Sequence, residues 1–184
     1  GLDFDLADFN NDNKIDIVVQ RTGMAISLVL NNSSTGSVAF NASSDIITGV
    51  NAGNYPHWGG VLAADFDNDG DIDIVYSVTG SASPFIRMMR NDAGTFSSPF
   101  SIGNFTGTSN MPSSLRVIDF NGDEKLDVAV TGGSNSGGLR AILNNYSTGQ
   151  LSSSDFTNVS TIYGSSIIGA VIEDFNQNGR IDII

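Results

Sequence analysis

The feature that most constrains this chain is a nine-residue acidic segment that occurs four times at a nearly constant spacing. The four copies begin at Asp8, Asp65, Asp119 and Asp174, which lie 57, 54 and 55 residues apart. Each copy starts with an Asp-Phe pair and ends with an aspartate that follows an Ile or a Leu. Regular spacing of this kind indicates that the chain is built from one structural unit of about 55 residues, repeated along the sequence.

Each acidic segment lies between two short apolar runs that are typical of β-strands. Residues 61–64 precede the second segment, and the β-branched run at residues 72–76 follows it. A third apolar run at residues 85–91 leads to a turn at Gly94, so that a weaker fourth strand over residues 95–102 can close a hairpin. Four antiparallel strands in a period near the upper end of known blade lengths predict an all-β fold, a β-propeller of four-stranded blades.

The repeats divide the 184 residues into three full periods and the start of a fourth. We place them at residues 1–55, 56–110, 111–165 and 166–184, within one β-propeller segment. Because a closed propeller usually needs about four to eight blades, we expect a fragment of a larger propeller, or a chain that associates with another copy of itself to complete the ring. A small, open array of blades is the alternative that the sequence leaves.

The acidic segments have the ligand pattern of a calcium loop. Oxygen-bearing side chains occupy positions 1, 3, 5 and 9, and a main-chain carbonyl can serve at position 7, as in the first half of an EF-hand loop. Gly70 at position 6 of the second segment suits a sharp turn with positive φ, whereas the third segment has Gly122 at position 4 and Glu124 at position 6, so its turn is expected to differ. The candidate metal ligands, with position 7 contributing its carbonyl, are Asp8, Asn10, Asp12, Lys14, Asp16, Asp65, Asp67, Asp69, Asp71, Asp73, Asp119, Asn121, Asp123, Lys125, Asp127, Asp174, Asn176, Asn178, Arg180 and Asp182.

The donor chemistry favours Ca²⁺. The segments contain neither Cys nor His, which disfavours Zn²⁺ and copper, and Mg²⁺ gives up its water ligands too reluctantly for an all-protein loop. Fourteen of the 20 acidic residues fall in these segments, a density that bound cations would offset. The second segment has four carboxylates at ligand positions and is expected to bind most tightly, and the fourth has two. The alternative is that these segments are Asx-rich turns that bind no metal. The occurrence of four copies of the segment in register disfavours this alternative.

Two further positions of the segment are apolar in every copy. The side chains at positions 2 and 8 are expected to point into the core while the oxygens face the ion, and position 7 is expected to leave its side chain in water. The residues at positions 2 and 8 are Phe9, Phe66, Phe120 and Phe175, and Ile15, Ile72, Leu126 and Ile181.

Composition excludes several classes of function. The formal net charge is −12, with only 8 Lys and Arg, which argues against nucleic acids and anionic membranes as partners. No apolar stretch approaches the roughly 20 residues that span a bilayer, so we expect no membrane insertion. Cysteine is absent, which removes disulfides and thiolate chemistry and makes bound metal a candidate source of stability.

The sequence shows no catalytic constellation, so we expect a protein that is not an enzyme. The single histidine, His57, lies in a loop with Tyr55 and Trp58 that has no counterpart in the other repeats. These aromatic side chains could contact a sugar or a peptide, and the alternative is that they pack between neighbouring blades.

The second acidic segment, Asp65-Phe-Asp-Asn-Asp-Gly-Asp-Ile-Asp73, and its flanking strands resemble an FG-GAP/VCBS repeat. This repeat is the blade unit of integrin α-subunit propellers and of many secreted bacterial proteins. The resemblance extends over essentially the whole chain, although the first, third and fourth segments depart from the D-x-D-x-D-G-x-x-D pattern and the literal Phe-Gly and Gly-Ala-Pro signatures are absent. It implies that the acidic loop joins the first two strands of a blade and holds Ca²⁺.

Two functions are consistent with these features. The first is an extracellular recognition or adhesion module that binds a protein or a glycan, with Ca²⁺ in a structural role. The second is a non-catalytic accessory propeller of a larger secreted enzyme. Both place the chain outside the cell, where abundant Ca²⁺ suits loops of weak affinity.

Overall fold

The computed structural model of the chain describes residues 3–21, 25–48, 60–78, 85–104, 111–133, 138–159, 162–163, 172–173, 175–176 and 182–183. Over these residues the structure is all-β, apart from one 3-10 turn, η1, at Ser153–Asp155. This confirms the predicted fold class. No helix in the described ranges has the length and apolar character needed to cross a membrane.

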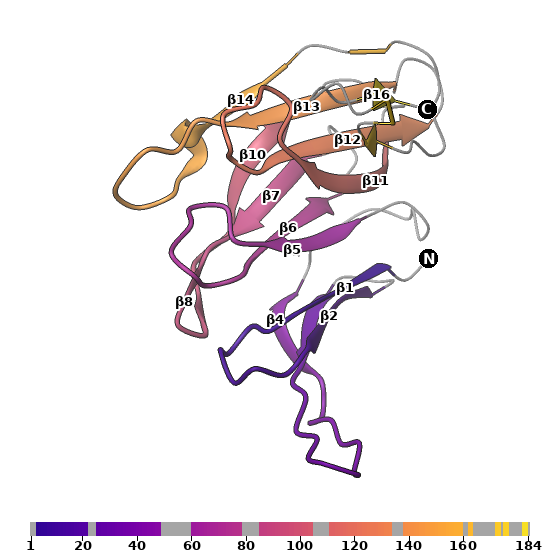
Figure 1. Cartoon of the computed structure of the whole chain (residues 1–184), viewed down its shortest axis with the longest axis vertical. Helices are drawn as coiled ribbons and strands as arrows, with labels where there is room; N and C mark the ends of the chain where they lie inside the picture. Colours follow the sequence, from indigo (N-terminus) through magenta and orange to yellow (C-terminus); the bar gives the residue numbers. More distant parts are fainter. Residues whose placement is uncertain are drawn as a thin grey trace.

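Three antiparallel sheets of four strands each form blades 1, 2 and 3 (Figure 1). Blade 1 contains β1 (Asp3–Ala7), β2 (Asp16–Arg21), β3 (Ala25–Val29) and β4 (Ser44–Thr48). Blade 2 contains β5 (Val61–Ala64), β6 (Asp73–Val78), β7 (Phe85–Met89) and β10 (Phe100–Asn104). Blade 3 contains β11 (Met111–Ile118), β12 (Asp127–Gly133), β13 (Leu139–Asn144) and β14 (Phe156–Asn158). A fourth unit is represented by the strand pair β15 (Ile172–Glu173) and β16 (Asp182–Ile183).

The outer part of blade 2 differs from the predicted single strand over residues 95–102. The structure places a short hairpin there, formed by β8 (Asn91–Asp92) and β9 (Thr95–Phe96), and β10 begins only at Phe100. The hairpin is held by a hydrogen bond from the Ser97 N–H to the Arg90 carbonyl (2.8 Å). Pro99, which has no N–H to donate to a ladder, separates the two elements.

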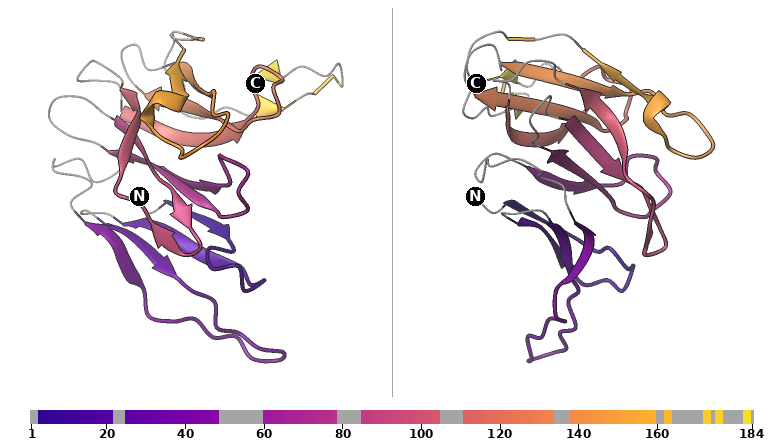
Figure 2. Two further views of the ribbon diagram at one scale, coloured as in Figure 1. Left: turned by 90° about the vertical axis from the view of Figure 1, so that its left-hand side faces the viewer. Right: turned by 180° about the vertical axis from the view of Figure 1, so that it is seen from behind.

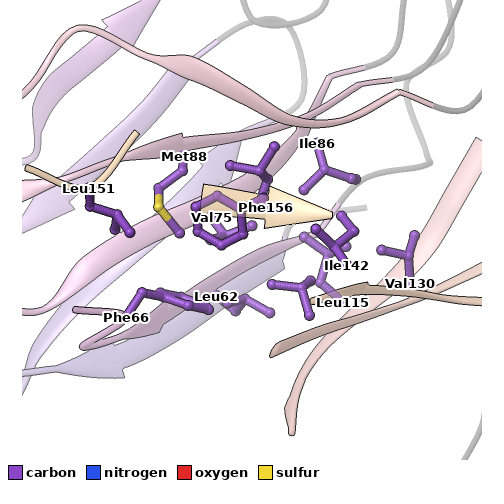
Figure 3. Packing of buried hydrophobic residues seen from close by; sticks show 12 residues of the cluster. Leu62, Phe66, Val75, Ile86, Met88, Leu115, Val130, Ile142, Leu151 and Phe156 are labelled. Carbon is purple, nitrogen blue, oxygen red and sulfur yellow. The ribbon is translucent and has the colours of Figure 1, made fainter. Parts of the chain in front are cut away.

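The blades stack face to face and bury an apolar layer at each junction (Figures 1 and 2). We call the face of a blade that is turned towards the preceding blade its leading face, and the opposite one its trailing face. Side chains alternate between these faces along a strand. In β6, Ile74 and Tyr76 pack on blade 1, whereas Val75 packs on blade 3 in the cluster of Figure 3, and all three side chains are fully buried.

The first strands of the blades, β1, β5 and β11, lie side by side along one edge of the stack. Asp3 and Asp5 of β1 accept hydrogen bonds from the backbone N–H groups of Val61 (3.1 Å) and Ala63 (2.8 Å) in β5. These carboxylates therefore satisfy donors on the open edge of the neighbouring sheet, which would otherwise be available for pairing with another strand.

The apolar positions of the acidic segments are buried only where a neighbouring blade covers them. Phe9 and Phe66 are buried, whereas Phe175 is 46% exposed and Ile15 is 54% exposed. For these last two residues the expectation of a core position is wrong, because positions 2 and 8 pack across the junction between blades and not within one blade. Ile72 and Leu126 illustrate this, since each packs in the layer shared with the preceding blade. Ile181 lies outside the described residues.

Candidate metal centre

The first three acidic segments form loops that join the first two strands of each blade and lie on the same side of the stack (Figure 1). In each loop the aspartate at position 1 accepts hydrogen bonds from the backbone N–H groups at positions 5 and 6. For Asp65 the donors are Asp69 (3.2 Å) and Gly70 (2.9 Å). Asp8 and Asp119 receive the equivalent bonds. Hydrogen bonds between the backbone and the first carboxylate therefore hold the shape of the loop.

The winding requires left-handed backbone at two positions of each loop. Position 6 has a φ of 62° at Asn13, 93° at Gly70 and 67° at Glu124. The backbone at position 4 is also left-handed in all three loops. The sequence prediction did not include this position, although each loop has Asn or Gly there, the residues that adopt positive φ most readily. The third loop therefore has the same turn as the others, contrary to expectation, and Glu124 accepts a conformation that costs about 1 kcal/mol for a residue with a Cβ.

The aspartates at position 9, Asp16, Asp73 and Asp127, are fully buried at the start of the second strand. Both oxygens of Asp73 accept backbone hydrogen bonds, one from Phe66 (3.1 Å) and one from Asn91 (2.9 Å). Asp16 and Asp127 make the same pair of contacts in their own blades. Position 9 therefore joins the acidic loop to the end of the third strand, in addition to its candidate role as a ligand.

Two asparagines that follow the third apolar run of a repeat link the loops to the neighbouring blades. The side-chain amide of Asn91 donates to the carbonyl of Phe9 (3.1 Å), and that of Asn144 donates to the carbonyl of Phe66 (2.7 Å). Both asparagines are fully buried. The signal in the sequence was the recurrence of Asn at the same place after each third apolar run, with Asn31 as the first member.

The second loop brings three carboxylates together. Oxygen atoms of Asp65, Asp67 and Asp73 lie within 4.8 Å of one another. Among the described residues, Asp67 Oδ1 is buried and has no hydrogen-bond partner. Burial, reinforced by the charges of Asp69 and Asp65, raises the pKa of Asp67 to about 6. A hard cation would compensate for both effects, and this donor set fits Ca²⁺.

Burial also raises the pKa of Asp73 to about 7, and the hydrogen bonds from Asn91 and Phe66 offset this rise only in part. Burial is also the main cause that raises the pKa of Asp127. The carboxylates at position 9 are therefore held in surroundings that disfavour their charge when no cation is nearby.

The residue at position 7 distinguishes the second loop from the other two. Lys14 lies 3.3 Å from Asp12, and Lys125 lies 3.6 Å from Asp123, so a lysine partly neutralises position 5 in loops one and three. In loop two the same position is Asp71. Its side chain was expected to lie free in water, but it accepts hydrogen bonds from the Asn11 side chain (2.7 Å) and the Ala93 N–H (2.8 Å).

Parts of the fourth loop have the same arrangement. The N–H of Phe175 donates to Asp182 Oδ2 (3.1 Å), as the phenylalanine at position 2 does in the other loops, and Asn176 Nδ2 also donates to that oxygen (2.9 Å). The remaining candidates of this loop, Asp174, Asn178 and Arg180, fall outside the described residues, as do Tyr55, His57 and Trp58.

Comparison with known proteins agrees with this architecture. The family model of the FG-GAP-like repeat matches the chain three times, over residues 8–76, 65–130 and 119–184. Cartilage acidic protein 1 from Xenopus tropicalis is 31% identical over 133 residues, which cover 70% of this chain. The chain spans 20% of the length of that relative. Both the repeated loops and these matches lead to one assignment: the chain belongs to the FG-GAP-like repeat family.

Proposed function

We propose that this chain is an extracellular calcium-binding recognition module, in which Ca²⁺ is structural and the propeller-like stack presents its loops to a protein or a glycan. The observation that carries the proposal is the centre of the second loop. Three carboxylates converge there, and a buried oxygen of Asp67 has no hydrogen-bond partner within the described part of the chain. Loops one and three share the same winding, which supports calcium binding by the other repeats as well.

The charge and the relatives support the remainder of the proposal. A formal net charge of −12 disfavours nucleic acids and anionic membranes as partners. The name of the frog relative associates that protein with cartilage and describes it as acidic, which supports an extracellular location. Since the described residues that gather at the loops are ligand-type oxygens and structural amides, we propose that the module itself is not an enzyme.

An accessory role in a larger secreted enzyme is the second candidate. It is favoured by one observation, that the chain matches only 20% of a much longer relative, so that other activities can reside elsewhere in a related protein. The two candidates share the calcium loops and differ in what the full-length protein contains. Screening this chain against glycans and extracellular-matrix proteins distinguishes them, because only a recognition module is expected to bind such a ligand without further domains.

Calcium binding is tested by thermal unfolding of the metal-stripped protein with Ca²⁺, with Mg²⁺ and with chelator, together with a metal count on the purified chain. A ligand at about 100 times its dissociation constant adds about 2.7 kcal/mol to the free energy of unfolding, which raises Tm by several degrees for a domain of this size. We expect Ca²⁺ to restore this stability and Mg²⁺ to fail. Identical melting curves under all three conditions, with no bound metal, would refute the proposal.

A further inference from the structure

Loops one and three each contain a cation that offsets part of their negative charge, whereas loop two contains none. Lys14 and Lys125 stand at position 7 of loops one and three, and each lies beside the aspartate at position 5. Loop two has Asp71 at this position, and it has one more carboxylate at the ligand positions than either of the other two loops. The loop with the highest density of negative charge is therefore the one without a cation of its own.

Arg90, which directly follows β7, lies next to residues that contact this loop. The N–H of Asn91, the next residue, donates to Asp73 Oδ1 of loop two (2.9 Å). The N–H of Ala93 donates to Asp71 of the same loop (2.8 Å). The hairpin that begins after Arg90 therefore packs against loop two, which brings an arginine to the loop from outside its own nine residues.

The guanidinium of Arg90 is held by partners from two blades. Its Nε donates to Asp92 Oδ1 (3.0 Å), and a terminal nitrogen donates to the other oxygen of the same carboxylate. Gln150, between β13 and β14, accepts hydrogen bonds from both terminal nitrogens (2.9 and 2.7 Å) when its amide oxygen faces the guanidinium. Arg90 is buried, so these bonds fix a charge that would otherwise be costly to remove from water.

The ion pair with Asp92 does not cancel the charge that loop two experiences. The Asp92 side chain is 54% exposed, whereas that of Arg90 is 9% exposed, so water screens the carboxylate more strongly than the guanidinium. The pKa of Arg90 is raised, first by its hydrogen bond to Asp92 and further by the charges of Asp67 and Asp73, against the opposing effect of burial. Arg90 and the carboxylates of loop two therefore stabilise one another electrostatically.

The other blades indicate that the fold itself does not require an arginine at this place. Leu30 and Leu143 occupy the equivalent position in blades 1 and 3, directly before Asn31 and Asn144. Among the three blades, arginine occurs only in the one whose loop has a fourth ligand carboxylate and lacks the position-7 lysine. This correlation points to a role for Arg90 in the charge balance of loop two.

We propose that Arg90 is the resident cation of loop two, in place of the position-7 lysine of loops one and three, and that it lowers the calcium affinity of this loop. In the metal-free protein, its charge offsets part of the repulsion among the carboxylates. When Ca²⁺ binds, the same charge repels the ion. The effect on affinity rests on the proposed calcium binding, whereas the interaction between Arg90 and Asp67 in the metal-free protein does not.

Calorimetric titration of the metal-stripped protein with Ca²⁺ tests the effect on affinity, and Asp67→Asn identifies the binding step that belongs to loop two. Arg90→Leu should bind Ca²⁺ there about three- to tenfold more tightly, because a like charge near the ion is removed. Arg90→Lys keeps the charge and should stay within about twofold of the unmodified protein. Arg21→Leu is the matched control and should leave the affinity unchanged. Arg21 is also paired with an aspartate, Asp45, but it lies at the end of β2 that is away from the loops.

A second measurement, without calcium, tests the interaction of Arg90 with Asp67. Urea denaturation in chelator compares the effect of Arg90→Leu in the unmodified chain with its effect in Asp67→Asn. The urea midpoint should fall in both backgrounds. The fall should be smaller in Asp67→Asn, because the arginine there has one charged carboxylate fewer to stabilise.

The two measurements separate the possible failures. If Arg90→Leu binds Ca²⁺ no more tightly than the unmodified protein, or if Arg90→Lys gains as much affinity as Arg90→Leu, the effect on affinity is refuted. Equal falls of the urea midpoint in the two backgrounds would refute the electrostatic interaction itself. If the unmodified protein binds no Ca²⁺, the proposed function fails, and the comparison in chelator still decides whether Arg90 is the cation of loop two.

Discussion

Two aspartates of the second loop differ in how far hydrogen bonds compensate for their burial. Both oxygens of Asp73 accept backbone hydrogen bonds, which offset only part of the rise in its pKa to about 7. Asp67 has a buried oxygen without a partner and a pKa raised to about 6, chiefly by burial. Its charge therefore opposes folding of the metal-free protein and favours cation binding, because a cation removes the cost of keeping the charged form buried.

At the residue scale we predict that Asp67→Asn stabilises the metal-free protein and weakens calcium binding. Asparagine already occupies this position in loops one and three, as Asn10 and Asn121, so the loop should keep its winding. The gain is expected to be about 1 kcal/mol in chelator at neutral pH, after allowance for the partial exposure of the group. Chemical denaturation in chelator and calorimetric titration with Ca²⁺ measure the two effects.

Asp71→Asn is the matched control for this prediction. It removes the same unit of charge from the same loop, but position 7 is assigned to ligation through its main-chain carbonyl. Calcium affinity should therefore fall much less for Asp71→Asn than for Asp67→Asn. Equal losses for the two variants would mean that only the overall charge of the loop matters, and that Asp67 is not a ligand.

At the element scale, the acidic loop of one blade is linked to the hairpin of the next through a continuous set of hydrogen bonds. The Asn91 amide binds the Phe9 carbonyl, and the Asn91 N–H binds Asp73. Asp73 in turn binds the N–H of Phe66, whose carbonyl accepts the Asn144 amide. Order imposed on one loop by Ca²⁺ is therefore expected to stabilise the junction with the following blade.

We predict that Asn91→Ala destabilises the protein by about 1–3 kcal/mol, because the Phe9 carbonyl loses its partner at a buried junction. The backbone N–H of residue 91 remains, so the contact with Asp73 is preserved. Equilibrium urea denaturation in Ca²⁺, at a concentration low enough to keep the chain monomeric, provides the free energy of unfolding.

Asn31→Ala controls for the local role of the side chain. Asn31 and Asn91 each accept a backbone hydrogen bond within their own turn, from Ser33 and Gly94, but the Asn31 amide donates to the Ile15 carbonyl of its own blade. Its replacement should cost less than about 1 kcal/mol. If the free energy of unfolding falls by the same amount in both variants, the asparagines act as turn residues and the contact between blades contributes no stability.

At the scale of the whole molecule, a blade is protected according to how many of its faces are covered. The central strand of blade 2 is enclosed on both sides, and Ile74, Val75 and Tyr76 are fully buried. In the equivalent strand of blade 1, Val18 on the trailing face is buried, whereas Ile17 and Val19 on the leading face are partly exposed. Burial that depends on a neighbour is characteristic of repeat architectures, in which each unit completes the core of the next.

We therefore predict that backbone amides of β6 exchange with solvent more slowly than those of β2. The two strands occupy the same place in their sheets and pair on both edges, so hydrogen bonding within the blade is matched. The difference should report the lower burial of the side chains on the leading face of β2. Hydrogen exchange followed by mass spectrometry on the dilute, calcium-loaded protein measures it, and equal protection of the two strands would contradict this account of the stack.

The repeated acidic segment was enough to predict the all-β fold, and its alternation of oxygens was enough to propose the ligand positions. Both depend on local chemistry, since strand periodicity and loop winding are set by residues within one period of the chain. The same reasoning failed for Ile15 and Phe175, which it placed in the core. Their burial depends on a neighbouring blade, and composition within one repeat does not show which blades have neighbours.

The sequence by itself determined the unit of structure, the order of its strands and the oxygens that can hold a cation, because those properties are encoded within about 55 consecutive residues. Only the tertiary structure decided how the units join. It showed that Asn91 and Asn144 reach the loops of the preceding blades, 82 and 78 residues earlier in the chain, whereas the equivalent Asn31 donates to the Ile15 carbonyl of its own blade. Contacts over such separations arise from the stacking of sheets, and no pattern within one repeat specifies them.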